Sequence, residues 1–370
     1  MTATVYVSAG ESSGDQHGAA VIDALRERIP DLAVEGMGGP ALQRSGVRVT
    51  QRMEALSVVG LAEVMSKVPA HAKHLFEAGT QFRKTEFDVA VLVDYPGFHM
   101  RLANAARRHD IPVLYFIAPQ MWAWGARRLG TLRKCVNHLA VILPFEEPFF
   151  RQHDIPTTFV GHPLMDRPAG PENSSARQAL GLSPGGPVLG VCPGSRAGEV
   201  QRLWPRFRDA ARAVQDALPE VVVVVAGISG LEYPGAEEYL VHWDDSPSVM
   251  SAADAALCKS GTTTLEAALA GTPMVVAYAM HEVTYRLARR MVRCDRIALV
   301  NLLTPNRDIV PEFIQHRATP AALARVLIPL LDPVGRVAQR QRDGFEEVRR
   351  VLGPPGAAQR VSGIIEELIH

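Results

Sequence analysis

The strongest constraint in this sequence is a pattern that occurs twice: a short β-branched run, then a loop rich in Gly and Ser, then a helical segment. In the first copy the run Thr4–Val7 leads into the loop 8–15 and a helix predicted over 18–28. In the second copy Val188–Val191 leads into the loop 192–199 and a helix predicted over 200–218. Strands separated by helices form parallel sheets that are covered on both faces. The chain is therefore predicted to begin a doubly wound α/β unit twice.

Further short apolar runs extend the pattern and are predicted to be strands: Val89–Val93, Val113–Phe116, Val221–Val225 and Met274–Ala277. A chain of 370 residues is long enough for two domains. We expect an N-terminal α/β domain over 1–165 and a C-terminal one over 185–353, with a hinge in the Pro- and Gly-rich stretch 163–187. Because Pro354-Pro355-Gly356 breaks the last helix, the segment 357–370 could pack back on the first domain.

The chain carries no net charge, since 39 Lys and Arg residues balance 39 Asp and Glu residues. No global field attracts it to nucleic acid, so an anionic ligand must be bound locally. The four cysteines lie far apart, which predicts buried free thiols rather than a zinc site or disulfides. Neither a signal peptide nor an apolar run of membrane-spanning length is found, so we expect a cytoplasmic protein, while a role at a membrane surface stays open.

The first loop places Gly10, Gly14 and Gly18 at intervals of four, which is not the Gly-x-Gly-x-x-Gly spacing of dinucleotide-binding folds. Binding of a nicotinamide is therefore weakly supported, and no cofactor is expected. A loop of small residues between a strand and a helix lets backbone N–H groups and Ser12 or Ser13 approach a ligand oxygen closely. A simple tight turn explains the same residues equally well.

Two helix starts in the C-terminal half suit an anionic ligand. In Pro193–Arg196 a Gly turn and a guanidinium stand at the start of a helix, and together with the helix dipole they suit a diphosphate without a metal ion. Lys259–Glu266 opens a second helix, with hydroxyl side chains for phosphate and Glu266 for ribose hydroxyls. The alternative is that these hydroxyl residues only cap a helix.

Asp94 ends the run 88–94, at the predicted carboxyl end of a strand. Ligand crevices of open α/β sheets lie at such strand ends, and a carboxylate there can deprotonate an attacking hydroxyl. Two alternatives remain open. Asp94 can instead stabilise a turn, and Glu11, Asp15 and His17 in the neighbouring loop are rival bases.

The aromatic segment Tyr115–Trp124 could line an acyl pocket, but large aromatic side chains are more often part of a core. A helix predicted over 284–293 places Arg286, Arg290 and Arg293 on one stripe. That stripe suits anionic lipid headgroups, although a solvated face is the commoner outcome.

His71 and His74 have the i, i+3 spacing of a metal-binding pair on a helix. Lys67 and Lys73 stand close by in the sequence, and such a mixture of charges favours a solvated face. No metal site is therefore predicted.

Ten short motifs occur in an order that resembles a known family. They are Ala9–Asp15, Gly36–Pro40, Val58–Val64, Asp94–Phe98, Ala118–Trp124, Leu143–Glu146, Val160–Pro163, Pro193–Arg196, Ser260–Glu266, and Asn301–Leu303 with Val310–Glu312. No one of them would suffice, whereas ten in order make chance similarity improbable. The family that they resemble is lipid-A-disaccharide synthase.

The resemblance implies a GT-B glycosyltransferase, in which two Rossmann-like domains with parallel sheets face a cleft and bind acceptor and donor respectively. The family joins UDP-2,3-diacylglucosamine to 2,3-diacylglucosamine 1-phosphate (lipid X) with inversion. It releases UDP and a tetraacyl disaccharide 1-phosphate in lipid A biosynthesis. It works as a peripheral protein on the inner face of the cytoplasmic membrane. The resemblance implies no metal ion, cofactor or nucleic acid, and it leaves a homodimer open.

Asp94 matches the family's proposed general base. The residues predicted to bind the substrates are Glu11, Ser13, Gly14, Gly194, Ser195, Arg196, Glu199, Ser260, Gly261, Thr262, Glu266 and Asn301. The stretch 225–254 is about one helix shorter than is usual in the family. Two alternatives stay open on the same architecture. One is a UDP-sugar 2-epimerase or hydrolase, or another glycolipid glycosyltransferase, and the other is a non-catalytic glycolipid-binding protein.

Overall fold

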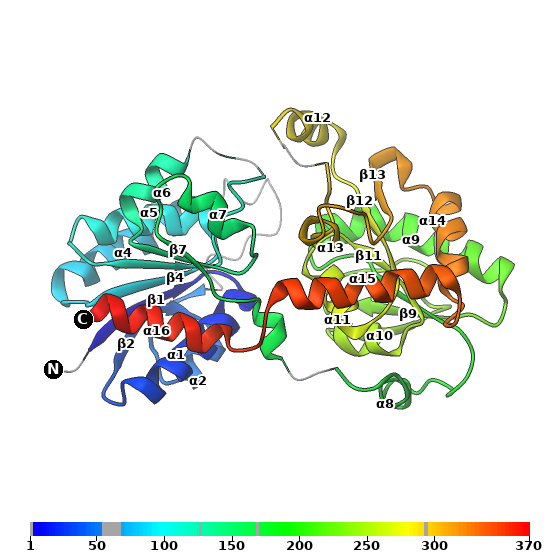
Figure 1. Ribbon diagram of the computed structural model, residues 1–370, viewed down its shortest axis with the longest axis horizontal. Coiled ribbons are helices and arrows are strands. Elements are labelled where there is room, and N and C mark those ends of the chain that lie inside the picture. The colour runs from blue at the N-terminus through cyan, green and yellow to red at the C-terminus, as the bar shows by residue number, and fades with distance from the viewer. Residues whose placement is uncertain (1–2, 54–67, 124, 126–127, 168–169, 292–294) are drawn as a thin grey trace. The chain divides into compact units, whose positions relative to one another are not determined.

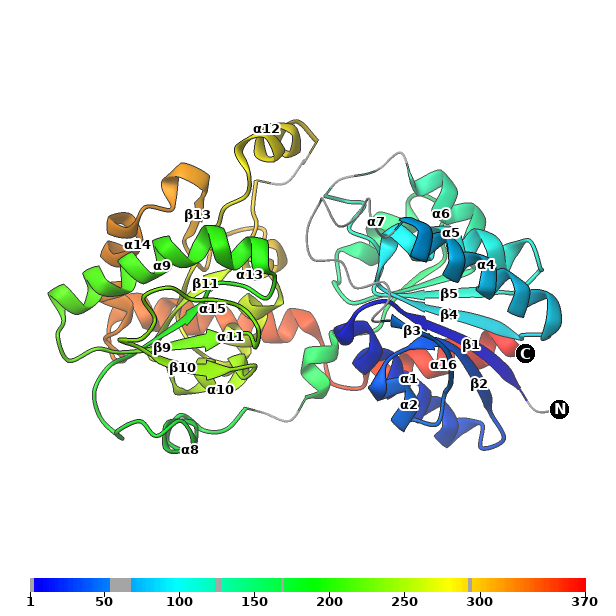
Figure 2. The ribbon, with the colours of Figure 1, turned by 180° about the vertical axis from the view of Figure 1, so that it is seen from behind.

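The computed structural model describes residues 3–53, 68–123, 125, 128–167, 170–291 and 295–370. The chain divides into two compact units. The first is made of Met1–Arg167 together with Leu352–His370, and the second is Pro168–Val351. Each unit contains one parallel sheet with helices on both faces (Figure 1; Figure 2 shows the reverse side).

The sheet of the first unit has seven strands in the order β3-β2-β1-β4-β5-β6-β7. Their bounds are β1 Thr4–Ala9, β2 Ala33–Gly38, β3 Arg48–Arg52, β4 Val89–Val93, β5 Val113–Phe116, β6 His138–Val141 and β7 Thr157–Phe159. Every residue of β4 and β5 is buried, as expected of apolar strands that are covered on both faces.

Helices cover the two faces of this sheet. They are α1 Ser12–Arg28, α2 Pro40–Arg44, α4 Val68–Lys84, α5 Pro96–Arg107, α6 Leu129–Cys135, α7 Glu146–Arg151, the 3-10 turn η3 Pro163–Asp166, and α16 Ala357–Ile369. Side chains of a strand point alternately to its two faces. Val5 and Val7 therefore pack in the core with α1 and α16, while Tyr6 and Tyr115 pack in the core with α4, α5 and α6.

The C-terminal segment belongs to the first unit, where α16 lies along α1. The carboxylate of Asp166 accepts hydrogen bonds from the backbone N–H groups of Gly356 and Ala357 at the start of α16. The guanidinium of Arg360 donates to the carbonyl of Val160, just after β7. These contacts attach the C-terminal helix to the segment 160–166 of the first unit.

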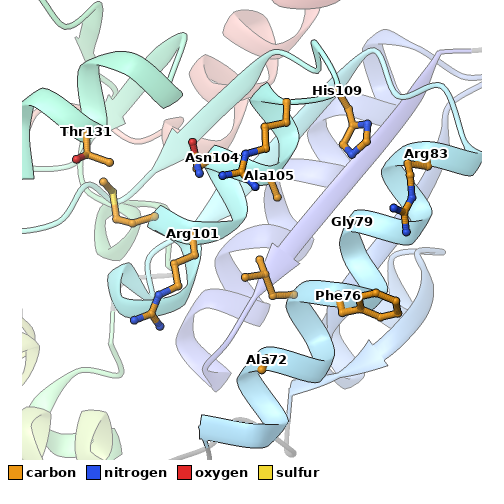
Figure 3. A pocket seen from close by; sticks show the side chains of 12 residues that line it. Ala72, Phe76, Gly79, Arg83, Arg101, Asn104, Ala105, His109 and Thr131 are labelled. Carbon is orange, nitrogen blue, oxygen red and sulfur yellow. The ribbon is translucent and has the colours of Figure 1, made fainter.

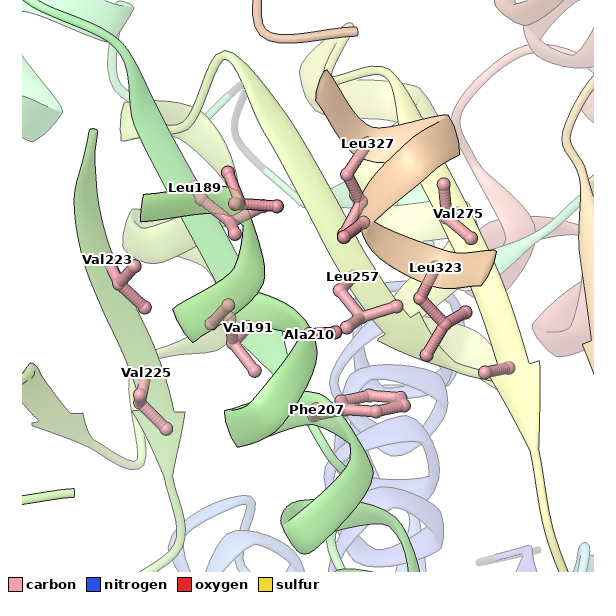
Figure 4. Packing of buried hydrophobic residues seen from close by; sticks show 14 of the residues in the cluster. Leu189, Val191, Phe207, Ala210, Val223, Val225, Leu257, Val275, Leu323 and Leu327 are labelled. Atoms are coloured by element: carbon pink, nitrogen blue, oxygen red, sulfur yellow. The ribbon is translucent and has the colours of Figure 1, made fainter. Parts of the chain in front are cut away.

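The sheet of the second unit has six strands in the order β10-β9-β8-β11-β12-β13. Their bounds are β8 Val188–Cys192, β9 Val222–Gly227, β10 Leu240–Trp243, β11 Ala255–Lys259, β12 Met274–Tyr278 and β13 Glu312–Ile314. The helices are α8 Asn173–Ala179, α9 Ala197–Ala217, α10 Ser246–Ala252, α11 Thr262–Ala270, α12 Glu282–Met291, α13 Leu299–Leu303, α14 Pro320–Leu327 and α15 Arg336–Leu352, with 3-10 turns η4 Gln315–Arg317 and η5 Ile328–Leu330. On one face, Phe207 of α9 and Leu323 of α14 pack with Leu257 of β11 (Figure 4).

The strands predicted from β-branched runs are all present, and β1 continues to Ala9. The strands that were not predicted are β2, β3, β6, β7, β10, β11 and β13. Four of these, β3, β7, β10 and β13, are the edges of the two sheets. An edge strand needs no continuous apolar run because only part of it is buried, so it carries a weak sequence signal.

Both helices that follow the glycine-containing loops begin earlier than predicted. α1 begins at Ser12 rather than Gly18, and α9 begins at Ala197 rather than Val200. The first turns are polar or small and lack the apolar periodicity on which the prediction rested. Ser13 and Gly14, predicted in a loop, therefore lie in the first turn of a helix.

The stretch 163–187, predicted to lack periodicity, contains both η3 and α8. Arg177 of α8 is buried, and its guanidinium lies 2.6 Å from the carboxylate of Asp254. The same guanidinium donates to the carbonyl groups of Ala252 and Gly186. The partners of Arg177 lie far from it in the sequence. The local composition of 163–187 therefore did not predict α8.

The short stretch between β9 and β10 contains no helix, and residues 228–239 form a loop. The ring of Tyr233 in this loop packs edge-on against Trp204, with centroids 5.4 Å apart. The cysteines at 135, 192 and 258 are free and buried, as predicted, while Cys294 lies outside the described residues. Among the helices described, none has both the length and the hydropathy to cross a bilayer.

Candidate functional site

Each sheet reverses its strand order once, and the predicted site residues gather at these two points. In the first unit the reversal is between β1 and β4, where Ala9 is the register partner of Val93. In the second it is between β8 and β11, where Cys192 is the partner of Cys258. Such reversals open a crevice at the carboxyl ends of the strands, where ligands of α/β proteins bind. The topology therefore gives each unit its own candidate site.

Asp94 lies at the end of β4 in a strained turn. Asp94 and Tyr95 both have φ of 51°, in the left-handed region. That conformation costs a non-glycine residue about 1–3 kcal/mol and persists only where the surroundings hold it, often at functional sites. Tyr95 is also the N-cap of α5, whose first residue is Pro96. The turn thus joins the strand end directly to a helix.

The ring of Tyr95 connects this turn to the first glycine loop. A Cβ at Gly10 would lie 2.4 Å from Cδ1 of Tyr95, so only glycine permits the ring to lie there. On α4, His71 stacks near the same ring, and its Nε2 lies 2.9 Å from the Tyr95 hydroxyl. The loop that contains Gly10 and Glu11 therefore packs against the turn that contains Asp94 and Tyr95.

The prediction of a solvated face at His71 and His74 is wrong. His74 is buried, and His71 packs on Tyr95. His71 also packs edge-on against Phe98 of α5, and the neighbouring lysines gave no sign of these contacts. In the ranges that the structure describes, no group of three or more His, Cys, Asp or Glu side chains is arranged to hold a metal ion.

The residues predicted in the first loop form the start of α1. Glu11 is the N-cap, with extended backbone, and no capping hydrogen bond from its side chain is found. Ser13 is exposed, while Gly14 is buried, and a Cβ at Gly14 would lie 3.5 Å from the carbonyl oxygen of Val93. The first turn of α1 thus packs directly against the end of β4, beside Asp94.

Two of the rival bases, Asp15 and His17, are poor candidates for the general base. The carboxylate of Asp15 is buried and accepts hydrogen bonds from the backbone N–H groups of Gly39, Ala41 and Leu42, so it caps the start of α2. Burial lowers the pKa of His17 to about 4, which leaves it a weak base. Asp94 and Glu11 remain as carboxylates at this strand reversal.

In the second unit, two helix starts follow the carboxyl ends of two neighbouring strands. Arg196 is the exposed N-cap of α9, after Gly194 with φ of +124° and the exposed Ser195. Gly261 is the N-cap of α11, with φ of +156°, and Thr262 follows as its first residue. Because β8 and β11 are adjacent and parallel, both sets of N–H donors lie at the carboxyl end of the sheet.

An ion pair links these two helix starts. Nζ of Lys259, at the end of β11, lies 3.0 Å from Oε1 of Glu199 in the first turn of α9. Both side chains are mostly buried, and Oε2 of Glu199 is buried without a hydrogen-bond partner in the described part of the chain. A Cβ at Gly261 would lie 3.3 Å from Nζ of Lys259. Lys259 has no predicted role of its own, because only the pairing of β8 with β11 brings it to Glu199.

Other predicted residues already have partners within the unit. The hydroxyl of Ser260 donates to the carbonyl of Ile297 at 2.6 Å, and Glu266 accepts from Ser246 at 3.3 Å. The amide of Asn301 is buried, donates to the Val310 carbonyl and Glu312, and accepts from two backbone N–H groups. Asn301 thus holds the segment 309–312 in place, and it would contact a ligand only by exchanging a partner.

The aromatic segment after β5 is anchored by a buried carboxyl. Tyr115, Phe116 and Met121 belong to the core, as predicted, while Trp124 lies outside the described residues. Trp122 is half-buried, and its indole N–H donates to Oε1 of Glu146 at 3.0 Å. Burial raises the pKa of Glu146 to about 7, although the hydrogen bonds from Trp122 and Leu143 oppose the shift. Local sequence patterns do not predict this anchor, because Trp122 and Glu146 are 24 residues apart.

A hollow of about 700 Å³ lies over α4 and α5 of the first unit (Figure 3). Leu75, Met100 and Ala105 provide apolar surface, and Arg83, Arg101 and Arg108 add positive charge. The ring of Phe76 at its rim is 71% exposed. None of the predicted site residues lines this hollow.

The predicted basic helix 284–293 corresponds to α12 Glu282–Met291. Arg286 and Arg289 are exposed, and the guanidinium of Arg286 pairs with Glu282 one turn earlier. Arg293 lies outside the described residues. Part of the predicted positive charge is therefore neutralised within the helix.

Comparison with known proteins decides the family. The family model described as "Lipid-A-disaccharide synthetase" matches residues 5–359. A lipid-A-disaccharide synthase of Geobacter sulfurreducens is 35% identical over 374 residues, which cover 99% of this chain and 97% of the relative. That of Myxococcus xanthus is 37% identical over 379 residues, with the same coverage. The chain belongs to the lipid-A-disaccharide synthase family.

Solved structures confirm the GT-B fold expected of this family. The glycotransferase of kitacinnamycin superposes with a TM-score of 0.61 at 17% identity, covering 99% of this chain and 98% of its own. A putative UDP-N-acetylglucosamine 2-epimerase from Listeria monocytogenes gives 0.64 at 11% identity, covering 98% and 95%. The fold is therefore shared by transferases and an epimerase. Membership of the lipid-A-disaccharide synthase family makes the chain a glycosyltransferase of lipid A biosynthesis rather than an epimerase or a non-catalytic binding protein.

Glu146 should make the stability of the protein depend on pH. Its folded-state pKa of about 7 lies above the ordinary 4.5, so its contribution is fully present below pH 4.5 and is lost as the pH rises through 7. We expect this group to lower the free energy of unfolding by about 3 kcal/mol between pH 4.5 and 8.

Denaturant unfolding of wild type and Glu146→Gln across that pH range checks this prediction, with Glu147→Gln on the same helix as the matched control. The difference in unfolding free energy between wild type and Glu146→Gln should change with pH. A constant difference would show that Glu146 does not titrate in this range.

Proposed function

We propose that this protein transfers 2,3-diacylglucosamine from UDP to 2,3-diacylglucosamine 1-phosphate, with inversion at the anomeric carbon, and yields a tetraacyl disaccharide 1-phosphate and UDP. The observation that carries the proposal is the position of Asp94, a carboxylate at the strand reversal of the first unit, in a turn that is held against its conformational preference. Membership of the lipid-A-disaccharide synthase family supports the choice of substrates.

Asp94 acts as the general base in this mechanism. As the acceptor hydroxyl oxygen bonds to the anomeric carbon, its proton passes to the Asp94 carboxylate and the bond from that carbon to the diphosphate oxygen breaks. A single displacement of this kind inverts the anomeric centre. Glu11 and the exposed Ser13, with the backbone of Gly14, bind hydroxyls of the acceptor beside it.

The second unit stabilises the departing UDP. Negative charge grows on the diphosphate as the sugar bond breaks, and preorganised donors aimed at that charge lower the barrier. The N–H groups after Gly194 and Gly261, the hydroxyl of Thr262 and the guanidinium of Arg196 supply such donors. Ser195 and Ser260 lie in the same two loops. Glu266 binds the nucleoside, and Asn301 supports this side of the site by holding the segment 309–312 in place.

Lys259 provides a second cation for the diphosphate. Its ammonium already lies between the two helix starts, with Glu199 as its partner. A diphosphate that enters this position offers Lys259 a stronger anionic partner. Oε2 of Glu199, which is buried without a hydrogen-bond partner in the described part of the chain, can then accept a hydrogen bond from a hydroxyl of the nucleotide sugar.

The hollow over α4 and α5 supports contact with the inner face of the cytoplasmic membrane, where acylated substrates reside. It combines apolar lining, the exposed Phe76 and three arginines, and such surfaces suit anionic lipid bilayers. Arg286, by contrast, is partly neutralised by Glu282. We therefore assign membrane contact to the hollow rather than to α12.

The proposed reaction is tested by incubating the purified protein with acylated or unacylated UDP-glucosamine, with and without the acylated sugar phosphate, and identifying products by mass. We expect the disaccharide and UDP only when both acylated substrates are present. Release of UDP or an altered sugar without acceptor would instead indicate hydrolase or epimerase chemistry.

Asp94→Asn should lower kcat by a factor of about 10² to 10⁴, because the amide cannot accept the proton. Asp88→Asn, at the opposite end of the same strand, is the matched control and should keep near-normal turnover. UDP release assays and thermal melting of each variant check the prediction. Near-normal turnover of Asp94→Asn with loss of turnover in Glu11→Gln would move the base to Glu11.

Arg196→Ala and Lys259→Met should each weaken UDP binding by at least about tenfold, since each removes a charge-assisted hydrogen bond to the diphosphate. Calorimetric titration with UDP measures this effect, with Lys84→Met in the first unit as the control.

Lys259→Met also leaves the Glu199 carboxylate buried and unpaired, so the Glu199→Gln/Lys259→Met double variant is the necessary companion. It should fold normally and still bind UDP weakly. Unchanged UDP affinity in a folded Lys259→Met variant would remove Lys259 from the site.

The variant Phe76→Ser/Arg83→Glu/Arg101→Glu should bind vesicles of anionic phosphatidylglycerol at least about tenfold more weakly than wild type at low salt, because both apolar contact and charge attraction are lost. Flotation assays measure the bound fraction. The control is Val334→Ser/Arg336→Glu/Arg340→Glu in the second unit, where Val334 is 88% exposed. Equal losses in the two variants would contradict a specific role for the hollow.

A further inference from the structure

We infer that His99 and Tyr115 are positioning residues that hold the main chain of Asp94 in its left-handed turn and so present the carboxylate at the strand reversal. This inference rests on the proposed function, in which Asp94 is the base. It is carried by hydrogen bonds, burial and backbone geometry in the first unit.

The carbonyl group of Asp94 receives two side-chain hydrogen bonds. The hydroxyl of Tyr115, on β5, donates to it at 2.7 Å. Nδ1 of His99, on α5, lies 2.6 Å from the same oxygen. On the other side of the residue, the N–H of Asp94 donates to the carbonyl of Phe116 at 2.9 Å. Both peptide groups that flank the Asp94 side chain are therefore fixed.

The chemistry of these partners determines the state of His99. A carbonyl oxygen only accepts, so Nδ1 of His99 must carry a proton. Burial lowers the pKa of His99 to about 4, so at neutral pH the ring is uncharged and Nε2 has no proton. Nε2 lies 2.8 Å from the hydroxyl of Ser8 on β1, which therefore donates to it. The chain of donors runs from Ser8 through His99 to the Asp94 carbonyl.

The side chains of Ser8, His99 and Tyr115 cannot contact the substrate directly. Ser8, His99 and Tyr115 are completely buried, each with 0% exposure. Burial, with a smaller contribution from the charge of Asp94, raises the pKa of Tyr115 well above its ordinary value, so its hydroxyl stays a donor. Any effect of these side chains on the reaction must pass through Asp94.

The backbone at Asp94 and Tyr95 needs these hydrogen bonds to keep its left-handed conformation. The carbonyl of Asp94 belongs to the peptide that precedes Tyr95, so its direction is tied to the positive φ of Tyr95. Pro96 follows, and a residue before proline is driven toward extended backbone. Without the two donors, the peptide could rotate and both residues could leave the left-handed region. The carboxylate would then move away from the end of β4.

Paired variants separate positioning from packing. Tyr115→Phe keeps the ring and removes one donor. Its matched control is Tyr6→Phe on β1, which β4 separates from β5 in the same sheet, since the buried Tyr6 hydroxyl has no hydrogen-bond partner in the described part of the chain. For His99, the amide of Asn can replace Nδ1, whereas the amide of Gln reaches the position of Nε2. His99→Asn should therefore keep the bond to Asp94, and His99→Gln should lose it.

Steady-state kinetics with the two acylated substrates should give a clear split. Tyr115→Phe and His99→Gln should each lower kcat by about tenfold with KM changed less than about twofold, since they displace the base rather than a binding group. Tyr6→Phe and His99→Asn should remain close to wild type. In an Asp94→Asn background, adding Tyr115→Phe should cause no further loss.

An equal loss from Tyr115→Phe with and without the Asp94 carboxylate would overturn the inference, and so would equal losses in Tyr115→Phe and Tyr6→Phe. A crystal structure of the His99→Gln/Tyr115→Phe double variant gives a test independent of activity. Residues 94 and 95 should leave the left-handed region, and φ values that stay near 51° would also overturn the inference.

These outcomes are distinct from failure of the proposed function. Absence of transfer by the wild-type protein, or near-normal turnover of Asp94→Asn, would reject the reaction or the base. The backbone of the double variant would still show whether the two donors hold the turn.

Discussion

The reversal of strand order at the centre of each sheet is the constraint on which the rest of the molecule depends. Parallel strands are joined by crossover connections, which are right-handed. Where the chain runs outward from the centre of the sheet in opposite directions, the crossover helices therefore lie on opposite faces of the sheet. In the first unit this happens between β1 and β4, and in the second between β8 and β11. The sheet holds the helix starts and loops at these points apart. Their polar groups can therefore contact a ligand while the apolar cores on the two faces of the sheet stay intact.

The two reversals have different chemical characters. The crevice of the first unit contains carboxylates, Asp94 and Glu11, and the strained turn that presents Asp94. That of the second contains helix N-termini, Arg196 and the Lys259–Glu199 pair. The first suits removal of a proton and the second suits a diphosphate. A chain with no net charge can thus combine two sites of different chemical character by distributing its charges unevenly.

Sequence patterns predicted the interior strands that are β-branched runs, such as Val89–Val93, but not the interior strands β2, β6 and β11. They missed edge strands and the early starts of α1 and α9, where polar residues follow no period. They also missed Arg177, His74 and Glu146, each of which is buried by residues distant in the sequence. Burial of a polar residue depends on its partners, and local composition does not contain that information.

The sequence by itself determined the repeated strand, loop and helix pattern, the family and the identity of Asp94 as a base candidate. These follow from residue order, since periodicity and short motifs are local properties. Only the tertiary structure decided that Asp15 caps a helix, that Lys259 meets Glu199, and that Ser8, His99 and Tyr115 converge on the Asp94 turn. Hydrogen bonds and ion pairs act over about 3 Å, so they form only after strand pairing has brought distant segments of the chain together.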